Sequence, residues 1–207
     1  MSKEVKTQKK EAQPKTQQQK TKRKTIDKWK KKAWYTLYAP EEFERKELGQ
    51  TVAEKPELVF GRTLEATASE LANQPKKSHI QIKFKVVNVT PNKGQCEAIG
   101  HNIKDSYLKR IIRRRTSKIM LVKKFETKDK KSVKVKILIV TEKKASGRQK
   151  SSILKIAEET TKKFLAQLEA KKVIEQLVFG SLPNKIYSEA KKIYPLKRVE
   201  IAGSKLL

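Results

Sequence analysis

Alternating apolar and polar residues predict a β-hairpin near the middle of the chain. Apolar side chains occupy every second position over residues 80–86, separated by Gln and Lys, which is the period of a half-buried strand. The alternation shifts by one position at residues 87–89, as it does at a β-bulge. A turn signal at residues 90–94 follows, so we expect residues 95–99 to return as the partner strand.

A second strand pair is predicted further along the chain. Apolar positions mark residues 119–125 and 133–140, and the polar stretch 127–131 between them is typical of a turn. In the second of these strands the Val and Ile side chains face one way, while Lys134 and Lys136 face the other. We expect two further extended segments at residues 34–38 and 57–67.

Apolar residues spaced three and four positions apart predict four helices. The expected helices span residues 105–112, 151–170, 173–178 and 183–195. Gly180 is a natural C-cap for the third helix, and Pro195 ends the fourth. Strands come first and helices later, which predicts an α+β fold with a mostly antiparallel sheet flanked by helices, and a barrel-like sheet is one form that this fold could take.

The chain is strongly basic, and its charge is unevenly distributed. Its 207 residues include 51 Lys and Arg against 22 Asp and Glu, a net charge of +29 at pH 7. Residues 1–32 carry a net +10 and residues 104–155 a net +15, whereas residues 40–75 carry a net −4. So much like charge on one body repels itself and is tolerated most easily beside a polyanion. The contrast indicates one region that meets phosphates and another that avoids them.

The same distribution predicts the domain organisation. Few apolar residues occur before residue 26, so this segment cannot bury enough surface to offset its ordering entropy. We expect a disordered basic arm over residues 1–25 and a single α+β RNA-binding domain over residues 26–207. No apolar run exceeds four residues, which excludes a membrane span. The basic N-terminus leads into no apolar stretch, which argues against a secretory signal.

The residue inventory argues against an enzyme. The sequence contains no glycine-rich phosphate-binding motif and no Cys-x-x-Cys pair, and its only histidines and thiol are His79, His101 and Cys96. A structural metal site needs about four ligands. We therefore expect no catalytic residue, no metal and no cofactor. Cys96 is predicted to be a small core residue and His101 a loop residue.

The densest arginine cluster is the strongest candidate for phosphate binding. Four of the nine arginines fall within residues 110–115. The planar guanidinium binds phosphate through two hydrogen bonds, so clustering of this scarcer cation is better evidence than the abundance of lysine. Carbonyl groups at the end of the preceding helix would occupy one or two of these arginines, not three in a row. The predicted RNA contacts here are Lys109, Arg110, Arg113, Arg114, Arg115 and Lys118.

A second predicted site is the loop over residues 143–152, which joins an apolar strand to an amphipathic helix. Cations before a helix N-terminus oppose the helix dipole, so the arrangement is unfavourable without an anion. Free backbone N–H groups, Ser hydroxyls and cations together would bind phosphate there. The predicted contacts are Lys143, Lys144, Arg148, Lys150 and Ser151. The alternative is a flexible solvated loop.

A third predicted site places lysines beside an aromatic ring. Its predicted contacts are Lys28, Lys30, Lys31, Lys32 and Trp34. Cations that flank an aromatic ring can hold a nucleic-acid backbone and a base together. Trp34 is at least as compatible with a role as a core anchor.

RNA is the favoured polyanion. The chain has no helix-turn-helix, zinc-finger or basic-zipper signature, and it lacks the signature of the common single-strand-binding sheet. Several phosphate sites along one chain suit embedding in a folded RNA. A basic architectural DNA-binding protein is the alternative. An RNA-processing enzyme would need a convergent set of titratable groups, and attachment to anionic membranes would need an amphipathic basic helix with bulky aromatics.

Three groups of residues resemble the motifs of a ribosomal family. They are Trp29-Lys30-Lys31-Lys32-Ala33-Trp34-Tyr35 with Ala39-Pro40, Gly61-Arg62-Thr63-Leu64-Glu65-Ala66 with Ser69-Glu70-Leu71, and Ile193-Tyr194-Pro195-Leu196. In order and spacing they resemble the archaeal and eukaryotic small-subunit ribosomal protein family known as eukaryotic-type S-one, also called S-three-a-e. The resemblance runs from about Asp27 to the C-terminus. The short end after Ile201 is similar to that of archaeal members.

The resemblance implies a structural constituent of the small ribosomal subunit, cytoplasmic and ribosome-associated. It would lie on the platform, near the 3′ end of the rRNA and the mRNA exit. Its partners would be the small-subunit rRNA and neighbouring small-subunit ribosomal proteins, with mRNA at the exit as a further candidate. The family implies no catalytic residue and no cofactor, and we expect neither membrane attachment nor a homo-oligomer. The RNA contacts named above rest on charge clustering alone.

Overall fold

The computed structural model describes residues 29–72 and 74–207. The chain divides into two units, residues 1–31 and 32–207, and the second contains all the strands and helices described below. The predicted arm over residues 1–25 lies outside the described residues.

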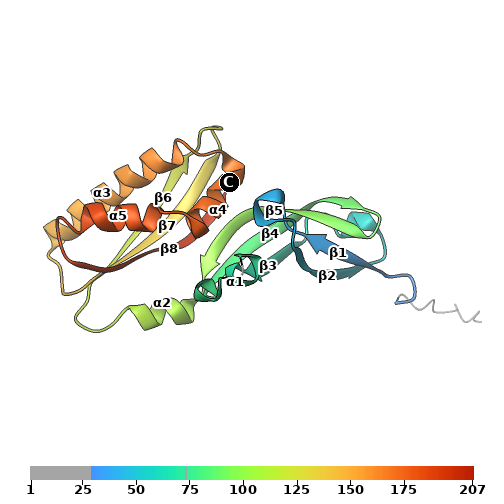
Figure 1. Ribbon diagram of the computed structural model, residues 1–207, viewed down its shortest axis with the longest axis horizontal. Coiled ribbons are helices and arrows are strands. Elements are labelled where there is room, and N and C mark those ends of the chain that lie inside the picture. Colours follow the sequence, from blue (N-terminus) through green and yellow to red (C-terminus); the bar gives the residue numbers. More distant parts are fainter. Residues whose placement is uncertain (1–28, 73) are drawn as a thin grey trace, which may run out of the picture. The chain divides into compact units, whose positions relative to one another are not determined.

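Eight strands of the 32–207 unit form one open sheet (Figure 1). The strands are β1 (Ala33–Tyr38), β2 (Glu47–Ala53), β3 (Thr63–Thr67), β4 (Ile80–Thr90), β5 (Lys93–Ile103), β6 (Lys118–Glu126), β7 (Ser132–Thr141) and β8 (Leu196–Leu206). Their order is β2-β1-β5-β8-β7-β6, and β3 joins through β4 to β5. Only β1 and β5 pair in parallel within the described residues. The predicted α+β fold with a mostly antiparallel sheet is confirmed, and the sheet is open.

Strand β5 is the branch point of this sheet. Strand β4 pairs along one edge of β5, while the other edge pairs first with β1 at residues 93–95 and then with β8 at residues 100–102. Gly100 is required at the second contact, because a Cβ atom there would lie 2.2 Å from the carbonyl oxygen of Ser204. The β1–β5 and β6–β8 parts of the sheet therefore meet at β5.

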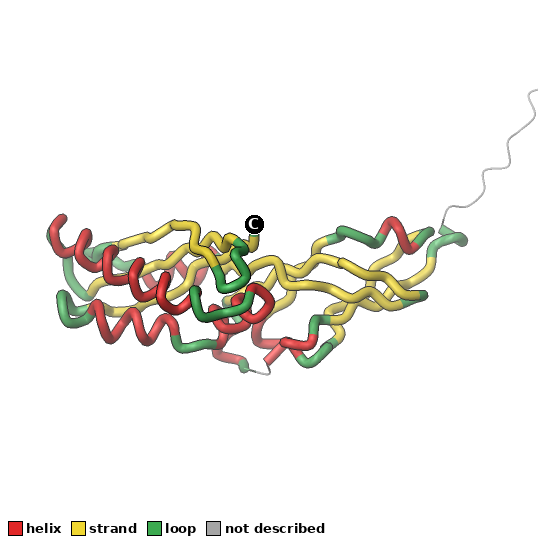
Figure 2. Tube along the Cα trace, turned by 90° about the horizontal axis from the view of Figure 1, so that it is seen from above, coloured by secondary structure: helices red, strands yellow, loops and turns green. Residues whose placement is uncertain are grey.

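Three helices cover one face of β6–β8 (Figures 1 and 2). They are α3 (Gly147–Leu165), α4 (Ala170–Phe179) and α5 (Leu182–Ala190). Apolar side chains from this face, such as Ile137 of β7, form a buried core with Ile153 of α3 and Ile186 of α5. On the opposite face, Ile111 of α2 packs against Leu138 of β7. The remaining elements are α1 (Ala68–Ala72), α2 (Asp105–Ile111) and the 3-10 turns η1 (Glu41–Phe43), η2 (Pro56–Leu58) and η3 (Pro75–Lys77).

Strands β1–β5 enclose a second core. Phe84 is fully buried there and meets the ring of Phe43 edge-on, with 5.5 Å between ring centroids. Helix α4 belongs to both cores, because Ile174 packs in this core and Val173 in the core of β6–β8. The shared helix therefore ties the two parts of the sheet together.

The predicted hairpins and the bulge are confirmed. Strands β4 and β5 pair around the predicted turn, and their register shifts between Val86 and Asn88. Strands β6 and β7 form the second predicted pair. Cys96 is a core residue, as predicted, with 3% of its surface exposed, and burial raises the pKa of its thiol to about 11.

The prediction for His101 is wrong. Strand β5 continues to Ile103 and carries His101 into the interior. The Nδ1 atom of His101 lies 2.6 Å from Oγ of Ser204, and Nε2 lies 3.0 Å from the carbonyl oxygen of Ile201. Because Gly100 allows β5 to approach β8 closely, the chain continues as a strand where a loop was expected.

Several other boundaries differ from the predictions. Strands β2 and β8 were not predicted, and the extended segment over residues 57–67 is a 3-10 turn followed by β3. Helix α3 begins at Gly147, four residues before the predicted start, and α5 ends at Ala190 rather than at Pro195. The earlier start of α3 changes the second predicted site.

Candidate nucleic-acid interface

The loop between α2 and β6 exposes three consecutive arginines, Arg113, Arg114 and Arg115. The carbonyl oxygen of Arg113 accepts a hydrogen bond from Oγ1 of Thr116 at 2.7 Å. Arg115 adopts a left-handed backbone, with φ of +66°. Within the described residues none of the three guanidinium groups has a carboxylate or carbonyl partner. The turn is therefore held by its backbone and Thr116, which leaves the guanidinium groups exposed to a ligand.

Ser117 joins this loop to the second predicted site. Its N–H donates to Oγ1 of Thr141 at 2.9 Å, and the N–H of Thr141 donates to the carbonyl oxygen of Ser117 at 3.1 Å. The N–H of Ala145 donates to Oγ of Ser117 at 3.1 Å. All three residues are buried, so these bonds fix the two loops against each other. Residues 113–115 and 143–144 consequently lie at the same end of the β6–β7 hairpin, the open end where β6 begins and β7 finishes. This open end is called the hairpin end below.

One of the family-like motifs supports this end of the hairpin. The hydroxyl of Tyr194 donates to the carbonyl oxygen of Lys144 at 3.0 Å. The N–H of Glu142 donates to the carbonyl oxygen of Pro195 at 3.2 Å. Both contacts hold the backbone, while the side chains of Lys143 and Lys144 stay exposed. The sequence pattern did not identify Ser117, Thr141 or Tyr194 as supports, because their role depends on the register of β6, β7 and β8.

The start of α3 corrects the predicted loop over residues 143–152. Ser146 is the N-cap and forms a capping box with Gln149, whose Oε1 accepts the N–H of Ser146 at 2.9 Å. Arg148 and Lys150 therefore lie in the first turn of α3. Oγ of Ser151 donates to the carbonyl oxygen of Gly147 at 3.1 Å. The cations still oppose the helix dipole, but the loop that we predicted is a capped helix.

Lys109 and Arg110 occupy the last turn of α2. The guanidinium carbon of Arg110 lies 5.3 Å from the ring centroid of Tyr107, and this ring stacks on His79 with 3.7 Å between centroids. Burial, together with the nearby guanidinium groups of Arg198 and Arg110, lowers the pKa of His79, so its ring is neutral at pH 7. Arg110 thus packs on an aromatic pair, unlike the three arginines of the following loop.

The third predicted site is divided in the structure. Lys28 lies outside the described residues, Lys30 and Lys31 belong to the first unit, and Lys32 and Trp34 belong to the second. Trp34 is 64% exposed, so its interpretation as a core anchor is wrong; Tyr35, 5% exposed, has that role. Whether these lysines and Trp34 act together stays a prediction.

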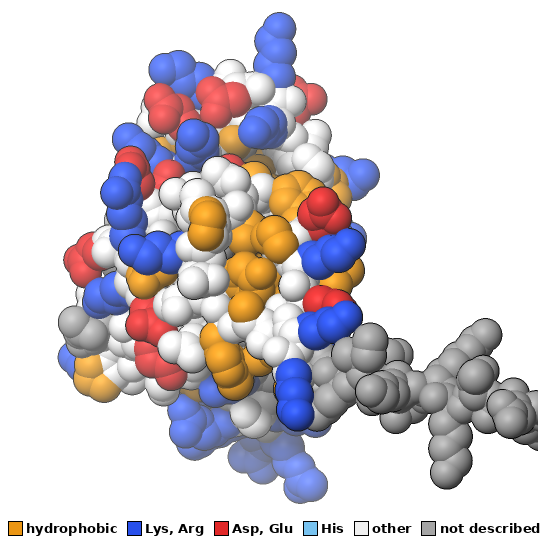
Figure 3. Space-filling model, turned by 90° about the vertical axis from the view of Figure 1, so that its right-hand side faces the viewer, with side chains coloured by type: hydrophobic (Ala, Val, Ile, Leu, Met, Phe, Trp, Pro, Cys, Tyr) orange, Lys and Arg blue, Asp and Glu red, His pale blue; other side chains and the backbone are white. Residues whose placement is uncertain are grey.

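The 32–207 unit also exposes large apolar side chains beside charged ones. On the face drawn in Figure 3, hydrophobic side chains gather between cations and acids. The exposed large apolar residues of this unit are Trp34, Leu58, Phe60, Val87, Met120, Val122 and Leu207.

Within the described residues, the cations at the end of the β6–β7 hairpin form no ion pair, although Glu142 precedes Lys143. Ion pairs in the described residues involve Arg45, Lys46, Lys83, Lys123 and Arg198. None of these belongs to the predicted contacts, which at this end are Arg113, Arg114, Arg115, Lys118, Lys143, Lys144, Arg148 and Lys150. A cluster with this excess of positive charge attracts a polyanion.

Four lysines that share one face of β6, β7 and β8 were not among the predicted contacts. They are Lys124, Lys134, Lys136 and Lys205. The alternation of residues 133–140 placed Lys134 and Lys136 on one face, but β8, which carries Lys205, was not predicted. Their arrangement became apparent only from the strand register.

Residues 29–72 and 74–207 were compared with the requirements of a metal site and of a membrane-spanning helix. In these residues no group of three or more His, Cys, Asp or Glu side chains is placed to hold a metal ion. No helix in this part of the chain is long and apolar enough to cross a membrane.

The comparisons with known proteins agree with one another on the kind of protein that this chain is similar to. The model of the ribosomal S3Ae family matches residues 20–207. The chain is 37% identical to the small ribosomal subunit protein eS1 of Methanobrevibacter smithii, over 91% of this chain and 97% of that protein. It is also 37% identical to the eS1 protein of Methanococcus vannielii, over 95% and 89% of the two chains. The eS1 protein of Staphylothermus marinus is 35% identical, over 87% and 85%.

Proposed function

This chain belongs to the ribosomal S3Ae family, and from that premise we propose that it binds the rRNA of the small subunit through the end of its β6–β7 hairpin. The family consists of ribosomal proteins, not enzymes. Residues 26–207 would act as one RNA-binding domain. RNA and other ribosomal proteins would be its partners, as for a component of the small subunit.

The convergence of two cation clusters on one surface carries this proposal. Hydrogen bonds of Ser117 to Thr141 and Ala145 join the loop of Arg113, Arg114 and Arg115 to that of Lys143 and Lys144. Arginine forks would bind phosphate oxygens through two hydrogen bonds, and the lysines would add point charge. Each neutralised phosphate releases counterions, and this release supplies much of the binding free energy.

The backbone of Arg115 supports a role for its side chain. A left-handed conformation favours glycine or asparagine, so an arginine there is unusual. Such strain persists where the surrounding structure or the function maintains it. Arg115 is thus a third exposed arginine of the same short turn.

The finer placement is also our proposal. From the family resemblance, the protein would lie on the platform near the rRNA 3′ end and the mRNA exit. The acidic stretch over residues 40–75 would then face solvent or a basic ribosomal protein, because it repels phosphates.

The test is binding of the full chain to an in vitro transcript of small-subunit rRNA across a range of salt concentrations. Replacing Arg113, Arg114 and Arg115 together by Gln should remove up to three phosphate contacts. The slope of log affinity against log salt should then fall by about 2 to 3. Replacing all three by Lys should restore most of the slope and part of the affinity, because the charge returns without the planar fork.

A matched control uses three exposed lysines of α3 that are not predicted contacts: Lys155→Gln, Lys162→Gln and Lys163→Gln. This variant loses the same charge elsewhere. If the arginine variant behaved like this control, the assignment of the hairpin end would be wrong. Equal competition by duplex DNA at matched salt would favour the architectural DNA-binding alternative.

A further inference from the structure

Three lysines lie side by side on three neighbouring strands. Lys124 of β6 pairs directly with Lys134 of β7, and Lys134 pairs directly with Lys205 of β8. Adjacent strands are about 4.8 Å apart, so the row spans about 10 Å across the sheet. Residues paired in this way project from the same face. We call Lys124, Lys134 and Lys205 the lysine row.

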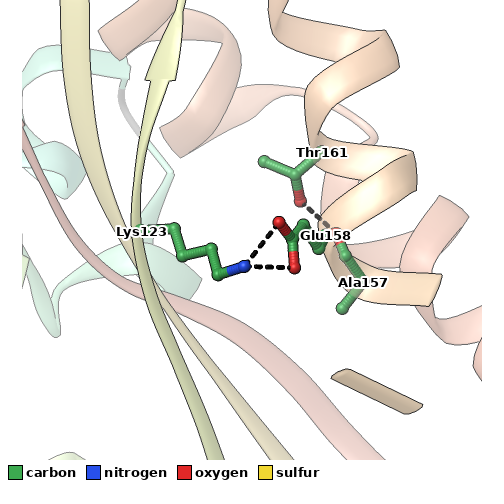
Figure 4. A network of polar contacts seen from close by, with 4 residues as sticks. All are labelled: Lys123, Ala157, Glu158 and Thr161. Atoms are coloured by element: carbon green, nitrogen blue, oxygen red, sulfur yellow. Dashed lines mark hydrogen bonds and ion pairs between the residues drawn. The ribbon is translucent and has the colours of Figure 1, made fainter. Parts of the chain in front are cut away.

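The row lies on the face of the sheet opposite to α3. Lys123, the neighbour of Lys124 on β6, points toward α3, and its Nζ lies 2.5 Å from Oε1 of Glu158 (Figure 4). Because successive strand residues point to opposite faces, Lys124 points away from this helix. Val133 and Val135, on either side of Lys134, are buried in the core beneath α3.

The row forms no ion pair within the described residues, although Glu126 lies two residues from Lys124 on the same face of β6. Each of Lys124, Lys134 and Lys205 is absent from the ion pairs of this part of the chain. Lys83 of β4 lies in the same line across the sheet, because it is paired with Gly100 of β5 and Gly100 is paired with Lys205. Unlike the row, Lys83 forms an ion pair, with 2.7 Å between its Nζ and Oε1 of Glu65. Like charges directly opposite each other on a sheet are unfavourable. A bound polyanion would remove this repulsion.

The surroundings of the row extend the positive surface. Lys136 is exposed two residues along β7 from Lys134, on the same face. Next to it, Gly203 pairs with Lys136 on one side and with the exposed Asn102 on the other. Gly203 itself is buried, so the groups offered to a ligand here are the exposed amide of Asn102 and the exposed ammonium of Lys136 on either side of it.

We propose that the lysine row is a second phosphate-binding site, which contacts the backbone of folded rRNA separately from the hairpin end. This proposal rests on the proposed function. Lys118, at the hairpin end, is six residues from Lys124 along β6, a distance of about 20 Å. The two sites therefore contact different phosphates.

Folded RNA fits this surface better than a single strand or a protein does. Sheets that bind single strands stack bases on aromatic rings, whereas the exposed apolar side chains of β6 are Met120 and Val122, 43% and 42% exposed. Protein–protein interfaces are depleted in lysine, whereas nucleic-acid interfaces are rich in positive charge. Lysine acts on phosphate as a point charge and needs no fixed orientation of the ligand.

The first experiment compares two variants of the full chain with equal loss of charge. One combines Lys124→Gln, Lys134→Gln and Lys205→Gln; the other is the Lys155, Lys162 and Lys163 control on α3. We expect the row variant to lower the salt slope for the rRNA transcript by about 2 to 3, and the control to lower it by less than about 1. Equal slopes for the two variants would overturn the second site.

This outcome is distinguishable from failure of the proposed function. If the row variant matches the α3 control while the Arg113–115 variant lowers the slope, only the second site is wrong. If every variant matches the control, the proposed function fails as well.

A second experiment identifies the ligand class directly. Lys134→Cys carries a photo-cross-linker, and the buried Cys96 does not compete for the reagent because burial raises its pKa. After assembly into small subunits, we expect cross-links to rRNA. Cross-links to a ribosomal protein alone would overturn the proposal in favour of a protein partner.

Discussion

His101 lies inside the sheet between β5 and β8, and its environment makes it sensitive to acid. Burial lowers its pKa from 6.5 to about 4, despite a hydrogen bond to the backbone of Ile201 that favours the charged form. The unfolded chain binds a proton near pH 6.5, whereas the folded chain binds it only near pH 4. The free energy of unfolding therefore falls as the pH falls through this window.

We expect this residue to contribute about 3 kcal/mol of stability at pH 7 that is absent below pH 4. Urea unfolding at pH 7 and pH 5 should show about 2 kcal/mol of this loss, because the folded-state pKa lies below pH 5. A His101→Gln variant is the control, since its side chain does not titrate and other groups are unchanged. The pH dependence should be smaller in this variant; an identical dependence in both proteins would contradict the assignment to His101.

Arg115 allows charge and backbone strain to be separated. Its φ of +66° costs a residue with a Cβ atom about 1 kcal/mol, and glycine avoids this cost. We expect the free energy of unfolding of Arg115→Gly to equal or exceed that of Arg115→Ala, although glycine also raises the conformational entropy of the unfolded chain. Both variants should lower the salt slope for rRNA by about 0.7 to 0.9, as for one phosphate contact. Chemical denaturation and salt titration measure the two effects, and no change in slope would exclude a contact by this side chain.

At the scale of elements, the lysine row predicts that removing the charge of its middle lysine stabilises the sheet. Lys134 has a like charge on both sides, from Lys124 and Lys205. Lys134→Gln should therefore raise the free energy of unfolding by about 0.5 kcal/mol at low salt.

The gain should shrink as salt increases, because the Debye length falls to about 8 Å at 0.15 M. Denaturant unfolding at two salt concentrations measures it. Lys155→Gln on α3 is the control, with no like charge paired directly opposite on a strand. A loss of stability at low salt in Lys134→Gln would show that this lysine is not under repulsion.

The elements that the sequence predicted are those with an unbroken period on one buried face. Strands β4 and β6 alternate because one of their faces is buried and the other is largely exposed, and β7 alternates over residues 133–136 before both of its faces become buried. In β8 the residues Ile201, Ala202, Gly203 and Ser204 are all buried, because the strand pairs on both edges and packs on both faces. Continuous burial hides the period, so β8 was missed. In β2 only Ala53 is buried, which leaves almost no apolar signal.

Helix α3 illustrates a local signal that was available. Ser146 and Gln149 have the spacing of a capping box, and this pair sets the start of the helix. The candidate site was predictable only in part. The arginines cluster in the sequence, but their approach to Lys143 and Lys144 depends on the β6–β7 register, and the lysine row needs Lys205 of the unpredicted β8.

At the scale of the 32–207 unit, β8 connects the two parts of the sheet. It pairs with β7 over most of its length and with β5 at residues 100–102. Its side chains contribute to the core under α3 through Leu196, Val199 and Ile201. Loss of β8 therefore removes contacts from both parts at once.

A chain that ends at Pro195 should consequently lose cooperative folding, not only its last strand. We expect far-ultraviolet circular dichroism to show reduced structure and the thermal transition to broaden or vanish. A chain that ends at Leu206 is the control, since it removes a single exposed residue. A sharp transition near that of the full chain in the first truncation would show that β8 is dispensable.

The position of β8 also has a consequence for synthesis. Strand β8, which lies between β5 and β7, leaves the ribosome that makes it after the other seven strands of the sheet. Until then, β5 and β7 each expose an unpaired edge, and such edges pair readily with other chains. A nascent copy of this protein must therefore be kept apart from its neighbours until β8 has been made, because only then can the sheet be completed.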